Sequence, residues 1–175
     1  MQNNTWNTKK LAYLGILTAA ALILSYVESL LPFFAGIPGM KLGLPNAAIV
    51  MILYLYGWKE AVLVNAVRIA AAGLLFGSMF GVLFSLCGAV LSLLCMCLAK
   101  RSGRFSQVGV SIAGGVSHNA GQILAAIFVV ENVRVGYYFF PLAISGTITG
   151  LIIGVISGEL VKRVGRVLKR QEYMG

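Results

Sequence analysis

The sequence predicts an all-α integral membrane protein, a bundle of six transmembrane helices in a single transmembrane domain over residues 1–175. Three observations predict this class: the composition, six long apolar runs, and basic residues placed between those runs. The chain is 59% hydrophobic and only 11% charged, with a mean hydropathy of +0.89. Because soluble domains carry roughly 25% charged residues, this chain has too few charges to cover its own surface in water.

Six apolar runs reach or approach the roughly 20 residues that a helix needs to cross a membrane. The first follows a polar, basic start and is longer than a signal-peptide core of roughly 7–15 residues, so we interpret it as an uncleaved span. The second and third are short, and we expect a tight turn at "GWKE" between them and partial cover by protein. An alternative of five spans treats these two as one re-entrant unit. The predicted spans are 11–31, 44–58, 61–76, 78–98, 108–130 and 137–161.

The last three apolar runs are each long enough to cross a membrane, and they differ in how clearly their ends are marked. Only "FGSMFG" divides the third run from the fourth, so that boundary is the least defined. The fifth run is apolar apart from a polar group in its centre. The sixth ends in "KRVGRVLKRQEYMG", which we expect to be a helix end that extends into water.

The basic residues predict the orientation. With the N-terminus inside, 11 of the 14 Lys and Arg fall on the cytoplasmic side, against Lys41 and Arg134 outside. Cytoplasmic loops of membrane proteins carry such an excess, so both termini are predicted to be cytoplasmic. This topology explains the formal net charge of +9 better than binding to nucleic acid does, and no nucleic-acid partner is predicted.

Small residues recur at one-turn spacing, a pattern that lets membrane helices approach closely. The clearest row is in the sixth run and consists of Gly146, Gly150, Gly154 and Gly158. Such rows serve packing inside the bundle or docking of another membrane protein. For docking, Gly15 and Ala19 on the first span are the candidates.

Arg68 lies about eight residues from each end of its short span. A charge at that depth needs a carboxylate, backbone carbonyls or a ligand anion as its partner. Glu28 and Glu159 are the candidate carboxylates, and depth disfavours Glu159. Arg68 and Glu28 are therefore either a structural ion pair or part of a ligand site.

The fifth run contains "SIAGGVSHNAGQILAAI", with His118, Asn119 and Gln122 near mid-membrane. One histidine in a core is often only a satisfied structural residue. Three hydrogen-bonding side chains within five residues favour a polar pocket, because polar groups in membranes face the bundle interior or a cavity.

The loop after the first span, "PFFAGIPGMKLGLPN", holds three of the four prolines and carries Lys41. Proline and glycine give a loop a defined shape. It is either a connector or a lid over an outward-facing pocket, with Lys41 as a cation above the site.

Signatures of catalysis, metals and cofactors are missing from the sequence. The chain has no Asp for an aspartate-rich diphosphate site and no Walker A motif. We interpret Cys87, Cys95 and Cys97 as buried structural thiols, and a lone histidine is a poor metal site. We therefore predict no enzyme, no catalytic residue, no metal and no cofactor.

Three stretches resemble a bacterial membrane family: "LAYLGILTAAALILSYVESLLPFFAGIPGMKLGLPN", "GWKEAVLVNAVRIAAAGLLFGSMF" and "GVSIAGGVSHNAGQ". The resemblance covers roughly residues 9–165. This family is called Gx transporter and is often labelled heptaprenyl diphosphate synthase component I. It is in turn similar to the substrate-binding S components of energy-coupling factor transporters, which are six-helix proteins that bind a vitamin or similar nutrient.

The resemblance implies a substrate-binding component in the bacterial plasma membrane, surrounded by lipid, that takes up a small polar or anionic cofactor-like nutrient. Its implied partners are a transmembrane coupling subunit and a pair of ATPases, with Gly15 and Ala19 facing the coupling subunit. Arg68, His118, Asn119, Gln122, Glu28 and Lys41 are the candidate substrate-binding residues. The alternative is a non-catalytic membrane accessory subunit in isoprenoid, quinone or membrane redox metabolism.

Overall fold

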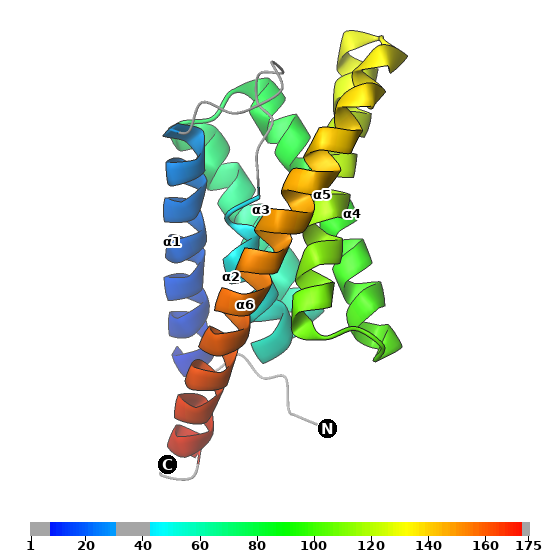
Figure 1. Ribbon diagram of the computed structural model, residues 1–175. Helices are drawn as coiled ribbons and strands as arrows, with labels where there is room; N and C mark the ends of the chain where they lie inside the picture. Colours follow the sequence, from blue (N-terminus) through cyan, green and yellow to red (C-terminus); the bar gives the residue numbers. More distant parts are fainter. Residues whose placement is uncertain (1–7, 31–42, 173–175) are drawn as a thin grey trace.

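The computed structural model describes residues 8–30 and 43–172, which form a bundle of helices (Figure 1). No strand occurs among these residues, so the predicted all-α class is confirmed. The helices are α1 (Thr8–Leu30), α2 (Asn46–Leu55), α3 (Trp58–Leu75), α4 (Met79–Ser102), α5 (Gln107–Val130), the 3-10 helix η1 (Val133–Tyr138) and α6 (Phe139–Glu172).

Four segments of the described chain are long and apolar enough to cross a membrane. They are α1, α4, α5 and Val133–Val167, which combines η1 with most of α6. Many large apolar side chains point outward from them, including Ile16, Leu94 and Phe128. Because helices satisfy their own backbone hydrogen bonds, they can cross hydrocarbon with such surfaces. The chain is therefore a multi-pass membrane protein.

The second and third apolar runs form two separate helices. α2 ends at Leu55, Gly57 turns the chain with a φ of +113°, and α3 begins at Trp58, so the expected tight turn is present. α2 is about 15 Å long, which is half of the hydrocarbon thickness. Seven of its ten residues are buried. In Figure 1, α2 begins well below the upper ends of α1 and α3.

Glycines let α5 pack closely between α4 and α6. A Cβ atom on Gly121 would overlap the carbonyl of Cys87 on α4, and one on Gly115 would overlap the carbonyl of Gly146 on α6. Small residues bring membrane helices together in this way, since their backbones then touch directly. The glycine row of α6 thus serves packing inside the bundle over three of its turns. The residues of this row that face α5 are Gly146, Gly150 and Gly154.

One end of the bundle, which we call the basic end, gathers most of the cations. The first turn of α1, the α2–α3 turn, the α4–α5 connection and the last turns of α6 all lie there (Figure 1). Lys10 Nζ lies 2.6 Å from Glu60 Oε1, which joins α1 to α3. Lys100 Nζ donates to the carbonyl of Leu53 at 2.5 Å, which joins α4 to α2.

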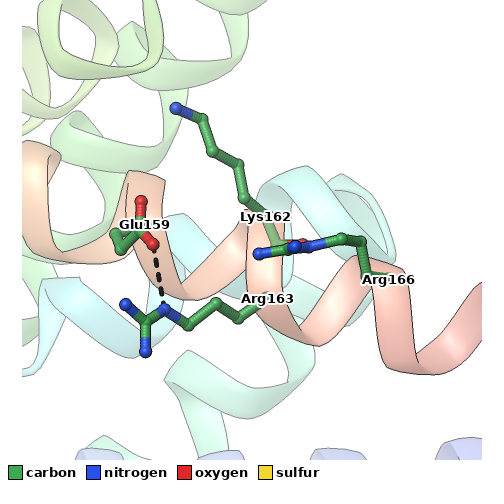
Figure 2. Close-up of polar contacts among 4 residues, drawn as sticks. All are labelled: Glu159, Lys162, Arg163 and Arg166. Atoms are coloured by element: carbon green, nitrogen blue, oxygen red, sulfur yellow. Dashed lines mark hydrogen bonds and ion pairs between the residues drawn. The ribbon is translucent and has the colours of Figure 1, made fainter.

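α6 extends the basic end beyond the predicted span. It continues to Glu172, so the basic C-terminal stretch is helical as expected. Figure 2 shows Arg163 donating through Nε to Glu159 Oε1 at 2.9 Å, with Lys162 and Arg166 beside them. Both partners of this pair are more than half exposed, so their charges are exposed on the outside of the bundle.

Candidate functional site

Arg68 is buried inside the bundle, on α3. Its Nη2 donates to Asn65 Oδ1 at 2.6 Å, and its Nη1 donates to Ser25 Oγ of α1 at 3.4 Å. Glu28, one turn along α1 from Ser25, is also buried and carries the opposite charge. Glu159, the other carboxylate considered for Arg68, instead pairs with Arg163 on α6. We call Ser25, Glu28, Asn65 and Arg68 the α1–α3 cluster.

Glu28 also binds the start of α2. Its Oε1 accepts hydrogen bonds from the backbone N–H groups of Gly43, at 2.5 Å, and Leu44, at 3.0 Å. Gly43 has a φ of +87°, a conformation that favours glycine. A carboxylate that accepts from backbone N–H groups forms charge-assisted bonds, which are stronger than neutral ones. Residues 43–46, here called the α2 turn, are thus held against the C-terminal half of α1.

His118 lies on α5 with its ring between α4 and the α2 turn. A Cβ atom on Gly88 would lie 2.8 Å from His118 Cε1, and one on Gly43 would lie 3.5 Å from His118 Cδ2. The two glycines therefore make room for the imidazole. Gln122 Nε2 lies 3.2 Å from His118 Nε2, with the donor set by the ring tautomer. Both side chains are buried in the bundle.

Asn119 faces the other neighbour of α5. Its Nδ2 donates to the carbonyl of Leu142 on α6 at 2.7 Å. Gly146 leaves space for this amide, since a Cβ atom there would lie 2.9 Å from Nδ2. Asn119 Oδ1 is buried and has no hydrogen-bond partner among the described residues. The polar residues of α5 are thus divided between two helix contacts.

The α2 turn lies between the α1–α3 cluster and His118. Gly43 binds Glu28 through its N–H, while its Cα faces His118 and the side chain of Asn46. Asn46 Nδ2 is buried and has no hydrogen-bond partner within residues 8–30 and 43–172. Contacts therefore run from Arg68 to His118 through residues of α1 and the α2 turn. This set of residues is the candidate site.

Three residues of the site were not predicted from the sequence. Ser25 precedes Glu28 by three residues and Asn65 precedes Arg68 by three, so each pair shares a helix face. That spacing was a usable signal for both. Asn46 had no such signal, because only the fold of the α2 turn brings it against Gly43.

Three of the predicted residues are not among those that the structure brings together. Lys41 and most of the proline-rich loop lie outside the described residues. Gly15 and Ala19 are exposed on α1, and a Cβ atom on Gly15 would meet no atom within 4 Å. Neither residue is used for packing within the described chain, so this face of α1 is open to lipid or to a partner.

Two threonines of α6 that could border the site make only local contacts. Thr147 and Thr149 donate to carbonyls of their own helix. The three cysteines are free thiols and only half-buried, rather than buried as interpreted from the sequence. No group of three or more His, Cys, Asp or Glu side chains suited to a metal ion occurs in the described part of the chain.

Residues 17–160 match the family model described as heptaprenyl diphosphate synthase component I, which covers more than four fifths of the chain. No curated protein and no solved structure matches the chain. The match confirms the family that the three sequence stretches resemble. The chain therefore belongs to the heptaprenyl diphosphate synthase component I family.

Proposed function

We propose that the chain is the six-span substrate-binding component of an energy-coupling-factor-like transporter, which takes up a small polar or anionic cofactor-like nutrient. The observation that carries this proposal is the position of the α2 turn inside the bundle, in contact with Glu28 on one side and His118 on the other. Arg68 is linked to the helix of Glu28 through Ser25. Transporters commonly bind substrate in the membrane interior, where an interrupted or shortened helix ends. The ten-residue α2 supplies such an end.

Unpaired polar atoms in the candidate site support an anionic or acceptor-rich ligand. Arg68 Nε and Asn46 Nδ2 are buried donors with no hydrogen-bond partner in the part of the chain that the structure describes. Buried polar groups in proteins are nearly always paired, so these two donors favour a ligand with carboxylate or phosphate oxygens. Asn119 Oδ1, at the α6 contact of α5, is a buried acceptor that would need a donor group on the ligand. The proposed lining residues are Arg68, His118, Asn119 and Gln122.

The proposed orientation places the α2 turn on the outer side of a bacterial plasma membrane. The basic end then faces the cytoplasm, together with both termini, as the excess of Lys and Arg favours. Glu28 holds the α2 turn in position. Lys41, two residues before Gly43 in the sequence, adds a cation that attracts the anion from outside.

The proposed partners are a transmembrane coupling subunit and a pair of ATPases. The chain has no Walker A motif, so ATP hydrolysis must come from other subunits. Gly15 and Ala19 give α1 an exposed strip of small residues, of the kind that lets a second helix approach closely. In this proposal Ala19→Leu weakens recovery of the coupling subunit without changing ligand binding.

The proposal is tested by identifying the small molecules that remain bound to the protein after purification. Mass spectrometry of extracts from gently purified protein is expected to find a polar or anionic metabolite in near-stoichiometric amount. Arg68→Lys keeps the charge but loses the planar fork, and it is expected to reduce retention about tenfold. His118→Ala is expected to do the same. Arg163→Ala, on the exposed surface of α6, is the matched control.

Unchanged retention in both site variants would remove Arg68 and His118 from the binding site. The folded state is checked by thermal unfolding of each variant, since Arg68 also joins α1 to α3. A variant that unfolds at the wild-type temperature and has lost its ligand supports a binding role over a packing role.

The family description favours a second candidate function, a non-catalytic accessory subunit in isoprenoid or quinone metabolism. The absence of Asp from the chain argues against prenyl-diphosphate condensation by the chain itself, because that chemistry uses aspartate-bound metal. Affinity purification from the native membrane separates the two candidates. Recovery of a coupling subunit with ATPases supports transport, whereas recovery of a soluble prenyl synthase supports the accessory role.

A further inference from the structure

α3 and α4 border a wedge-shaped groove on the surface of the bundle. The two helices touch near their connection, where Gly73 faces Val82. Toward the basic end they leave a groove of about 860 Å³. Its floor is buried, at Ile69, Ala89 and Leu93. Its walls are exposed apolar side chains such as Val90 and Leu94, so the groove opens sideways into the lipid.

The wide end of the groove has an aromatic and cationic rim. Trp58, Lys100 and Arg101 line it. Lys100 is fixed by its hydrogen bond to the carbonyl of Leu53, and Lys59 Nζ lies 5.8 Å from the centre of the Trp58 ring. Tryptophan and basic residues are typical of the membrane interface, where lipid head groups lie. The groove therefore joins an apolar slot to a positively charged mouth.

We propose that this groove binds one anionic phospholipid, with an acyl chain in the slot and the phosphate at Arg101 and Lys100. The cations of the rim favour an anionic head group, and the apolar walls favour an acyl chain. The sideways opening lets a bilayer lipid enter without leaving the membrane, while its second chain stays in bulk lipid. This inference does not depend on the proposed transport function, because it uses the apolar walls and the cations of the groove, although Asn65 of the α1–α3 cluster also lines the groove.

Trp58 itself reports occupation of the groove. The chain has two tryptophans, so Trp6→Phe leaves Trp58 as the single fluorophore. The full chain is reconstituted in phosphatidylcholine vesicles that contain increasing fractions of brominated phosphatidylglycerol, or of brominated phosphatidylcholine in a matched series. Bromine quenches indole fluorescence on contact. We expect half-maximal quenching by brominated phosphatidylglycerol at a mole fraction at least about fivefold lower than by brominated phosphatidylcholine. The reason is that each basic residue near an anionic head group contributes about 1 kcal/mol.

Two pairs of variants test the two parts of the site. Arg101→Ala is expected to reduce the phosphatidylglycerol preference about fivefold, whereas Arg163→Ala, a cation of the basic end on α6, leaves it unchanged. Ala66 lines the groove, and Ala66→Phe is expected to lower quenching by both lipids. Ala70→Phe is the control, because Ala70 is exposed on α3 one turn away and lies outside the groove.

Equal quenching by the two head groups in the Trp6→Phe chain would overturn the proposal. So would equal effects of Arg101→Ala and Arg163→Ala. A prenyl diphosphate also combines an anionic head with an apolar tail. The two ligands are compared by competition, in which farnesyl diphosphate or phosphatidylglycerol without bromine is added to displace the brominated lipid and restore Trp58 fluorescence. If farnesyl diphosphate does so at a much lower mole fraction, the groove binds a prenyl diphosphate and the phospholipid proposal is wrong.

Discussion

Glu28 of α1 holds the backbone N–H of Gly43 in a hydrogen bond of 2.5 Å, and Gly43 is the residue at which the chain turns into α2. The same oxygen accepts the N–H of Leu44. Since α2 begins inside the bundle, these two N–H groups would otherwise lack partners in a low-dielectric environment, which is costly. Glu28 therefore fixes where α2 begins, and it also places a negative charge near Arg68.

Glu28→Gln is expected to lower the free energy of unfolding by about 1–2 kcal/mol. Glutamine has the same shape and keeps one acceptor oxygen, but it loses the charge that strengthens both backbone bonds and stabilises Arg68. Thermal unfolding in detergent measures the change. Glu131→Gln removes an exposed carboxylate at the end of α5 and serves as the control. Equal stability of the two variants would show that the charge on Glu28 is not needed for the α2 turn.

Gly88→Ala is expected to destabilise the contact between α4 and α5 by about 1–3 kcal/mol. The added methyl group would lie 2.9 Å from both Nδ1 and the backbone oxygen of His118. The ring can turn away, but the backbone oxygen moves only with α5. Gly15→Ala is the control, because open space surrounds Gly15 on α1 and alanine is the better helix former. Thermal unfolding compares the two, and a Gly88→Ala variant as stable as Gly15→Ala would contradict the close packing at His118.

Alanine substitutions at two glycines of the α6 row are expected to change the stability of the protein differently. Gly146→Ala would place a methyl group 2.9 Å from Asn119 Nδ2 and against the carbonyl of Gly115, so a loss of about 1–3 kcal/mol is expected. At Gly158 the nearest atom lies 3.9 Å away, and Gly158→Ala is expected to be neutral or stabilising. Unfolding curves of the two variants measure the difference. Equal destabilisation would mean that α6 packs on α5 along its whole length.

The helices of this chain were predictable because their signals are local. Apolar runs mark the helices, and the turn at "GWKE" is visible because Gly57 and the charged pair after it interrupt them. The C-terminal extension of α6 was equally visible as a basic stretch without proline. In each case the residues that carry the signal are the residues that form the element.

The sequence did not predict that the polar residues of α5 contact two different helices, because this depends on which helix lies on each side of α5. His118 and Asn119 are adjacent in the sequence but about 100° apart around a helix. One faces Gly88 on α4 and the other binds Leu142 on α6. The burial of Asn65 beside Arg68 follows from spacing, whereas the bond of Arg68 to Ser25 requires the packing of α1 on α3.

Two ion pairs of the basic end are expected to differ in their contribution to stability. Glu60 is buried and lies 2.6 Å from Lys10 Nζ, so Glu60→Gln leaves a partly buried cation and is expected to cost about 1–3 kcal/mol. The Arg163–Glu159 pair in Figure 2 lies on the exposed surface of α6, and Glu159→Gln is expected to leave the unfolding temperature unchanged. High salt should weaken the exposed pair more than the buried pair, because solvent ions reach the exposed charges more easily. Thermal unfolding of both variants at low and high salt provides the measurement, and a larger loss for Glu159→Gln would contradict the burial of Glu60 between α1 and α3.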